Sequence, residues 1–400
     1  MLQPAIDHAR RGVPVAPSQA FWHDFRRDEQ AAWPGFTAAF HPAGRAPQVG
    51  ELLQLPALAA TLEQLARHGA RDFYDGEIAA LIAAGLQAAG SPLDAADLAA
   101  TQARDVTPLR VPYRGLELLT MPPPTQGITT LQAMALLERF DLHAVAEGSA
   151  DHLHLMVEAI KQAFIERDRF VADPDFADVP VGRMLDPAHL DMLAARISRT
   201  QALPWPHPYR TGDTVYFAAA DREGRCVSAL QTIYYDWGSG VVAGDTGILW
   251  HNRGAAFSPH DDHPNAWAPG KRPFHTLNPG LALEGGKPRW LYGTQGADGQ
   301  PQTLVALLTR LIDHGLDPWH ALSRPRFLLG RTFSDGQDNL KVEADVGDAV
   351  LQELQRRGHA VRVLPAQSAL AGQAGVIGIE ADGSMQGAHD PRGDGTAVGL

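Results

Sequence analysis

The stretch DTVYFAAADREGRCVSALQTIY, residues 213–234, decides how the chain folds. Strand-forming residues on both sides of the turn sequence DREG predict two strands joined as a hairpin. If the loop is residues 222–224, Asp221 opposes Arg225, and counting along both strands places Thr214 opposite Thr232. Two hydroxyl groups then meet at the open end of the hairpin. Cross-strand threonine pairs also simply stabilise sheets, so the hairpin alone leaves the role of Thr214 open.

Composition narrows the class of protein. The chain has 400 residues, of which 44% are hydrophobic, enough to fill a core. Its 34 basic and 46 acidic residues give a net charge of -12, which argues against binding nucleic acid or an anionic membrane. The single cysteine, Cys226, excludes an intrachain disulfide. Residues 1–8 lack the pattern of a secretion signal and no run of eighteen apolar residues occurs, so a cytoplasmic location is expected.

Apolar spacing predicts a largely helical first half and a strand-rich second half, separated by the proline-rich linker LPWPHPYR at residues 203–210. His152 and His154 are two positions apart on a predicted helix, which favours exposed side chains over metal ligands. The elements expected from the pattern are two helices within 52–90, a strand at 109–121, helices at 129–140, 151–170, 301–316 and 346–358, and strands at 247–250, 281–283, 289–292, 360–364 and 374–380.

A glycine-rich segment, GTQGADGQP at residues 293–301, follows a predicted strand and opens a predicted helix. Backbone amides at such a helix start have no intrahelical partner and lie at the positive end of the helix dipole. The segment is therefore suited to hold a negatively charged oxygen. It does not match a Walker loop and no acidic residue follows in a nucleotide-binding arrangement, which excludes nucleotide binding.

Short motifs of distinctive composition are distributed along nearly the whole chain. They are Phe73-Tyr74-Asp75-Gly76, Tyr113-Arg114-Gly115, Met121 to Pro124, Asp173 to Phe176, Thr214, Phe217 to Asp221, Gly238 to Val242, Thr246 to Leu249, Asn252-Arg253, Phe257-Ser258, Lys271-Arg272-Pro273, Asn278-Pro279, the 293–300 loop and Asp390-Pro391-Arg392. In this order the motifs resemble the gamma-glutamyltransferase family of N-terminal nucleophile hydrolases. The resemblance implies an α+β fold, a four-layer αββα sandwich.

Members of this family are precursors that cut themselves to expose a threonine. The resemblance places the cut between Asp213 and Thr214, giving a mostly helical large part, 1–213, and a small part, 214–400, that associate as a heterodimer. It implies that Thr214 is the nucleophile, that Thr232 hydrogen-bonds it, and that the amides of Gly296 and Ala297 stabilise the oxyanion. No cofactor or metal is implied, and the substrate is a small-molecule amide.

The positions that would bind a gamma-glutamyl group differ from the family pattern. Tyr234, Arg253 and Ala256 replace an asparagine, a glutamine or glutamate and an aspartate, and His275 with Thr276 replaces a pair of serines. Without the aspartate a substrate ammonium group loses its anionic partner, whereas an arginine and a histidine favour a carboxylate. The phrase RPFHTLNP at 272–279 is similar to the oxamate amidohydrolase and acylase subgroup. Hydrolysis of a carboxylate-bearing amide such as oxamate is therefore favoured over gamma-glutamyl transfer or glutathione hydrolysis.

Two other hypotheses remain. Residues 1–50 do not resemble the N-terminal portion of the family, which leaves open a truncated fold that is neither cleaved nor active. The segment SPHDDH, residues 258–263, contains residue types that bind zinc, and a metal-dependent hydrolase is a further alternative. Six adjacent loop residues cannot easily surround one ion without distant ligands, so this alternative is disfavoured.

Overall fold

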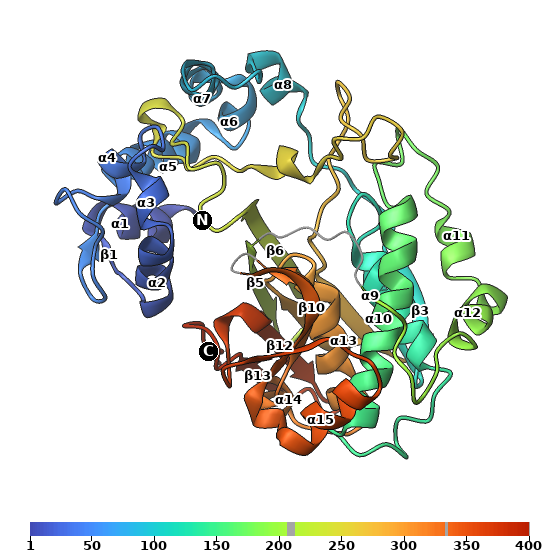
Figure 1. The fold of residues 1–400 in the computed structure, drawn as a ribbon. Helices are drawn as coiled ribbons and strands as arrows, with labels where there is room; N and C mark the ends of the chain where they lie inside the picture. Colours follow the sequence, from blue (N-terminus) through green and yellow to red (C-terminus); the bar gives the residue numbers. More distant parts are fainter. Residues whose placement is uncertain (206–212, 333–334, 400) are drawn as a thin grey trace. The chain divides into compact units, whose positions relative to one another are not determined.

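The computed structural model describes residues 1–205, 213–332 and 335–399, without the side chains at positions 213, 332, 335 and 336. The chain forms two compact units (Figure 1). The first unit comprises Met1–Asp105 and Ile233–Asn252, and the second comprises Val106–Thr232 and Arg253–Leu400. All the predicted site residues except Tyr234 belong to the second unit.

The first unit is mainly helical. Its two hydrophobic clusters centre on Ile82 and on Phe36, whose ring lies 5.0 Å from that of Trp237 between centroids. Its elements are α1 (Gln3–Arg11), β1 (Val13–Pro14), α2 (Pro17–Phe25), α3 (Arg27–Gln30), α4 (Phe36–Phe40), β2 (Leu52–Leu53), α5 (Pro56–His68), α6 (Asp72–Asp75), α7 (Glu77–Ala88), α8 (Ala95–Ala100) and the 3-10 turn η1 (Gly244–Thr246).

The second unit is built on a six-stranded antiparallel sheet in the order β13-β12-β8-β7-β4-β3. The hairpin β5-β6 and a three-stranded sheet, β11-β10-β9, accompany it. The strands are β3 (Leu109–Tyr113), β4 (Leu116–Thr120), β5 (Asp213–Ala220), β6 (Cys226–Tyr234), β7 (Gly280–Glu284), β8 (Lys287–Thr294), β9 (Phe327–Thr332), β10 (Asp335–Glu343), β11 (Val361–Leu364), β12 (Ala374–Ile379) and β13 (Met385–His389).

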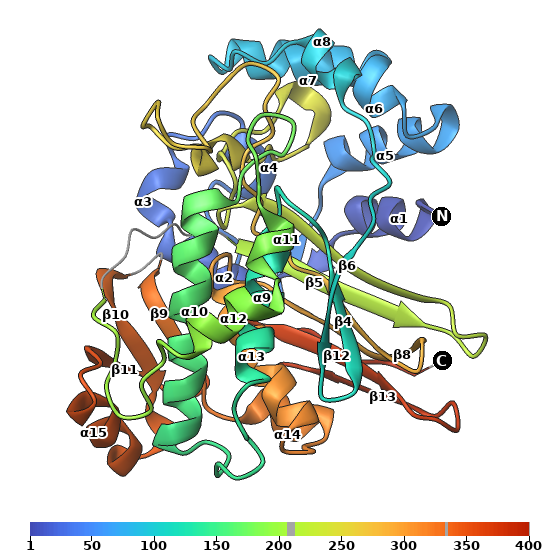
Figure 2. The same cartoon turned by 90° about the vertical axis from the view of Figure 1, so that its right-hand side faces the viewer.

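Helices cover one face of the six-stranded sheet. Helices α9 and α13 pack on its strands, and α10 packs on both helices (Figure 2). Side chains of this face, such as Trp290 and Tyr292, join the main hydrophobic core with the helices. The helices of this unit are α9 (Gly127–Leu137), α10 (Ala150–Phe170), α11 (Val181–Met184), α12 (Pro187–Ala194), α13 (Gly299–Ile312), α14 (Pro318–Ser323) and α15 (Asp348–Arg356), with 3-10 turns η2 (Arg253–Ala256), η3 (Ala344–Val346) and η4 (Ala369–Ala371).

The hairpin β5-β6 covers the other face of the sheet. Side chains alternate between the faces of a strand, so Gly293 points away from the helices that Tyr292 contacts. There the ring of Tyr216 lies so close to Gly293 that an added Cβ would come within 2.1 Å of it, and Gly375 of β12 lies against the same ring. Three of the four expected layers, helices, sheet and hairpin, thus lie in the second unit, and the α+β class is confirmed.

Most of the predicted elements are present, with two differences, and one prediction about side-chain exposure is wrong. Residues 109–121 form two strands, β3 and β4, rather than one. Residues 247–250 are not a strand: Gly247 adopts φ +70°, and only an isolated bridge joins Val242 to Leu249. His152 and His154 are fully buried, contrary to the prediction, because α10 lies beneath α9, α13 and α15 and leaves little of its surface to solvent.

Candidate functional site

The hairpin brings Thr214 and Thr232 together as the sequence predicts. The amide of Asp221 donates to the carbonyl of Arg225 at 3.0 Å, and Gly224 closes the turn with φ +81°. The Asp221 carboxylate accepts hydrogen bonds from two amides of the same turn. At the open end the hydroxyl of Thr214 donates to Thr232 Oγ1 at 3.2 Å. The predicted juxtaposition is confirmed, whereas the catalytic role of the pair stays a prediction.

Gln300 is a third group at this hydroxyl, and the sequence analysis missed it. Its Nε2 donates to Thr214 Oγ1 at 3.3 Å, and its side chain is fully buried in the first turn of α13. The hydroxyl of Thr214 therefore lies between a threonine and a carboxamide. The available signal was the position of Gln300, a polar residue at the end of the glycine-rich loop. The apolar pattern of the helix that follows obscures this signal.

The 293–300 loop presents two backbone amides. Gly296 has φ +120° and Ala297 has φ +48°, a left-handed conformation that is uncommon for alanine. Within the described residues, the amides of Gly296 and Ala297 donate no hydrogen bond. Buried amides are nearly always paired, so free ones at the start of α13 are suited to bind an anionic oxygen.

Buried polar side chains hold this loop in place from the helical side. Gln126 precedes α9, and its Nε2 donates to the carbonyls of Ala297, at 2.7 Å, and Thr276, at 2.9 Å. Arg167 of α10 donates to Gln126 Oε1 at 3.1 Å and pairs with the carboxylate of Asp298 at the same distance. Sequence spacing gives no signal for Gln126 or Arg167, because each acts across the fold on a segment more than 100 residues away.

A second support lies on the other side of the loop. Gln295 donates its amide to the carbonyl of Gln373 at 3.2 Å, next to Gly372. Arg326 donates to the Gly372 carbonyl at 3.1 Å and forms an ion pair with Asp390. Burial alone would raise the pKa of the Asp390 carboxyl, but the charges of Arg326 and Arg392 outweigh it and hold that pKa below its ordinary value.

Two of the predicted substrate-binding residues contact each other. Arg253 is 4% exposed and donates to the hydroxyl of Thr276 at 3.2 Å. His275 is half-buried and its Nδ1 lies 2.7 Å from the carbonyl of Pro273, which fixes this nitrogen as the donor. The backbone of His275 also pairs with Pro124 and Gln126. Through Gln126, therefore, the segment with His275 and Thr276 is tied to the 293–300 loop.

Two further predicted residues, Tyr234 and Asp213, lie at the ends of the hairpin strands. Tyr234 ends β6 with φ +82° and is buried in the first unit, where its ring lies 4.8 Å from that of Tyr235. Tyr234 belongs to the first unit, whereas the other predicted site residues belong to the second, and its role in substrate binding stays a prediction. Asp213 begins β5, and its side chain lies outside the described residues.

The segment at 258–263 forms a loop in which residues 259–262 are exposed. Ser258 donates its amide to Asn265, and His263 Nδ1 accepts from the amide of Asn265 at 3.0 Å. Across the residues with defined positions, the one group of three side chains that could hold a metal lies elsewhere and consists of His154, Glu158 and His359. The metal-dependent hydrolase hypothesis thus gains no support from this loop.

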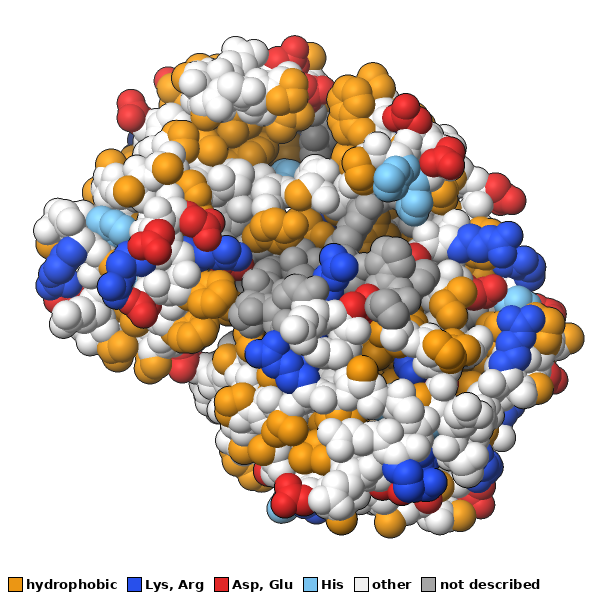
Figure 3. All heavy atoms as spheres, in the orientation of Figure 1, with side chains coloured by type: hydrophobic (Ala, Val, Ile, Leu, Met, Phe, Trp, Pro, Cys, Tyr) orange, Lys and Arg blue, Asp and Glu red, His pale blue; other side chains and the backbone are white. Residues whose placement is uncertain are grey.

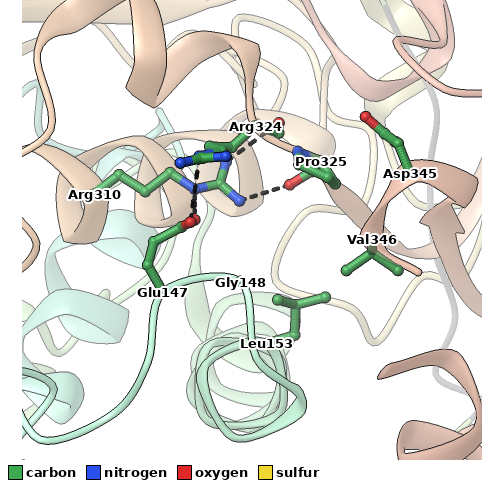
Figure 4. Close-up of a pocket in the computed structure, with 8 residues that line it drawn as sticks. All are labelled: Glu147, Gly148, Leu153, Arg310, Arg324, Pro325, Asp345 and Val346. Atoms are coloured by element: carbon green, nitrogen blue, oxygen red, sulfur yellow. Dashed lines mark hydrogen bonds and ion pairs between the residues drawn. The ribbon is translucent and has the colours of Figure 1, made fainter. Parts of the chain in front are cut away.

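A cavity of about 190 Å³ lies in the second unit, lined by none of the predicted site residues. Figure 4 shows the buried guanidinium of Arg310 beside Glu147, 2.8 Å apart, and the carbonyl of Pro325, 2.6 Å away. Burial lowers the pKa of Arg310 to about 10. The guanidinium of Arg310 is thus bonded to groups of the protein at the cavity. Its lining is Glu147, Gly148, Leu153, Arg310, Arg324, Pro325, Asp345 and Val346.

Charged side chains of both signs are mixed on one face of the molecule. On the face shown in Figure 3, acidic and basic side chains of the described residues are interspersed. Within those residues, no helix combines the length and apolar character needed to cross a bilayer.

Comparison with known proteins identifies the family. The model of the gamma-glutamyltranspeptidase family matches residues 1–400. The chain belongs to this family. It is 42% identical over 399 residues to the oxamate amidohydrolase proenzyme of Klebsiella pneumoniae, covering all of this chain and 75% of that one. It is 40% identical over 400 residues to the glutathione hydrolase-like YwrD proenzyme of Bacillus subtilis, covering all of this chain and 76% of that one.

Solved structures agree on the fold. The crystal structure of a cephalosporin acylase from Bacillus halodurans matches with a TM-score of 0.89 and 33% identity, over 97% of this chain and 72% of that one. The relatives are named as hydrolases and acylases, and several as proenzymes. The chain is therefore a member of a family of amide-hydrolysing enzymes, as its sequence motifs predict.

Proposed function

We propose that this protein is an autoprocessing amidohydrolase with Thr214 as its nucleophile. The observation that carries the proposal is the position of the Thr214 hydroxyl, at hydrogen-bond distance from both Thr232 and Gln300 at the start of β5. The pair of free amides at Gly296 and Ala297 supports it, because an acyl-transfer enzyme needs donors for the oxyanion.

Maturation follows from the chemistry of a hydroxyl beside a peptide bond. Thr214 Oγ1 attacks the carbonyl carbon of Asp213, the bond from that carbon to the Thr214 nitrogen breaks, and an ester forms. Water then hydrolyses the ester, which leaves a carboxylate on Asp213 and a free amino group on Thr214. The products are fragments of 213 and 187 residues (400 minus 213) that stay together as a heterodimer.

The new amino group is the general base in turnover. The reference pKa of an α-amino group is near ~8, so its neutral form is available close to neutral pH. It takes the proton of Oγ1 as this atom attacks the substrate amide. The oxyanion lies on the amides of Gly296 and Ala297, the amine departs with the transferred proton, and water hydrolyses the acyl-enzyme.

We propose a small amide that bears a carboxylate as substrate, with oxamate as the first choice. The buried guanidinium of Arg253, fixed on Thr276, and the imidazole of His275 are the groups that would bind the carboxylate. Ala256 is buried and supplies no charge for a substrate ammonium group. The identity to an oxamate amidohydrolase supports this choice, and the identity to a glutathione hydrolase-like protein makes a gamma-glutamyl compound the alternative.

Intact-mass analysis of the purified chain beside Thr214→Ala tests the nucleophile. We expect two fragments that meet at Thr214 in the parent and one uncut chain in the variant. A parent that remains uncut would refute the proposal and favour the hypothesis of a truncated fold that is neither cleaved nor active. For the cleaved parent, hydrolysis of oxamate is compared with that of a gamma-glutamyl anilide, and Arg253→Ala should raise KM for the carboxylate-bearing amide about tenfold or more.

A further inference from the structure

Gln300 has one amide atom in use and one without a partner. Its Nε2 binds the Thr214 hydroxyl, whereas its Oε1 accepts no hydrogen bond in the described part of the chain, although the side chain is fully buried. The neighbouring buried Gln302 is different: its carboxamide donates to the carbonyls of Asp298 and Leu329 and accepts from the amide of Leu329. A buried, unpaired carbonyl oxygen is unfavourable, so a partner is expected at Gln300.

We propose that Gln300 binds the leaving group of the substrate, with Oε1 accepting a hydrogen bond from the N–H of the amide that is cleaved. This inference rests on the proposed role of Thr214. The two terminal atoms of a carboxamide share one planar group, so a donor bound to Oε1 lies close to the hydroxyl that Nε2 holds. The amide nitrogen of the substrate is bonded to the carbon that Oγ1 attacks, which places it in that position.

A hydrogen bond from the substrate N–H to Gln300 Oε1 also assists the step that breaks the amide bond. As the bond from Oγ1 to the carbonyl carbon forms, the Oγ1 proton moves to the Thr214 amino group. That proton then passes to the substrate nitrogen, whose bond to carbon breaks as the amine leaves. An N–H held by Gln300 Oε1 turns the nitrogen lone pair away from Gln300 and toward the proton donor. An ester has no such hydrogen, and a site built around an N–H discriminates against it.

The test compares an amide and an ester of the same acyl group, oxamate and monoethyl oxalate, in the cleaved parent and in Gln300→Met. Both substrates lose the contact of Nε2 with Thr214, so the loss specific to Oε1 is the difference between them. We expect kcat/KM for the amide to fall about 10- to 100-fold more than kcat/KM for the ester. Gln302→Met is the matched control, and we expect it to lower the melting temperature without changing the amide-to-ester ratio. Equal losses on both substrates in Gln300→Met would overturn the inference and leave Gln300 as a residue that only positions Thr214.

A substrate-side measurement covers the case in which Gln300→Met does not mature. The parent is given the N-methyl and N,N-dimethyl amides of the same acid, each corrected for its rate of hydrolysis by hydroxide. We expect the dimethyl amide, which lacks an N–H, to react at least about tenfold more slowly. Equal corrected rates would refute the contact. A parent that is uncut, or an active Thr214→Ala, would instead refute the proposed nucleophile, so the two failures are distinguishable.

Discussion

Replacing Gln126 by methionine tests whether the 293–300 loop is held in place by contacts from the helical side. The change keeps the volume of a fully buried side chain and removes two donated hydrogen bonds, to Ala297 and Thr276, and one accepted from Arg167. At about 1 kcal/mol net for each bond, the free energy of unfolding should fall by roughly 3 kcal/mol. The variant also leaves the buried carbonyls of Ala297 and Thr276 without this donor, so the fall in the free energy of unfolding should be no smaller than this figure.

The same change should reduce turnover. Ala297 supplies one of the two free amides, and loss of an oxyanion donor typically costs about 100- to 1,000-fold in kcat. Gln126→Met loosens the loop without removing the donor, so we expect a fall of about 10- to 100-fold in kcat, with a smaller change in KM. Denaturant unfolding measures the first effect, and steady-state hydrolysis of the substrate that the parent accepts measures the second.

A matched control is Gln64→Met, because Gln64 makes an exposed hydrogen bond to Glu77 in the first unit. This variant should keep its stability within about 0.5 kcal/mol and its full turnover. If Gln126→Met behaves like the control in both measurements, the loop does not depend on Gln126, and the account of its support from the helical side is wrong.

Two further perturbations address the packing of the hairpin and the ion pair of Asp390 with Arg326. Gly293→Ala places a Cβ within 2.1 Å of the Tyr216 ring, so the free energy of unfolding should fall by about 1–3 kcal/mol and turnover should fall with it. Gly182→Ala is the control, because nothing lies within 4 Å of that position, and it should change neither quantity. If Gly293→Ala is as stable in urea as the parent, the packing of the hairpin on the sheet is wrong. The pKa of Asp390 is lower in the folded state than its unfolded value of ~3.9, so the ionised carboxylate stabilises the fold above that value, and this stability is lost as pH falls through the folded pKa. The free energy of unfolding in urea should therefore fall more from pH 6 to pH 3 in the parent than in Asp390→Asn. Parallel pH dependence in the two proteins would exclude this carboxyl as a cause.

The hairpin and the glycine-rich loop could be predicted because their signals are local. The turn at Asp221 fixes the pairing of the two strands, and this register alone brings Thr214 to Thr232. Likewise, the first amides of a helix have no partner within the helix, so a glycine-rich helix start indicates amides that can bind a ligand. Local turn chemistry is short in range and strong, so tertiary contacts did not override it.

The groups that support the site could not be predicted because they act over long sequence separations. Gln126 and Ala297 are 171 positions apart, and Gln300 and Thr214 are 86 apart. The error at His152 and His154 has the same origin. A helix whose polar residues point at other helices has the same sequence pattern as one that points them at water, and here His152 bonds Thr309 while His154 bonds His359.

The way the 293–300 loop is anchored supports its assignment as an oxyanion site. Gln126 binds the carbonyl of Ala297, and the support at Gln373 uses the amide of Gln295. Both anchors therefore leave the amides of Gly296 and Ala297 unused. A loop needed only as a turn gains stability by pairing those amides. One that must bind a developing negative charge needs them fixed and free, because donors that are already oriented need no reorganisation when the charge appears.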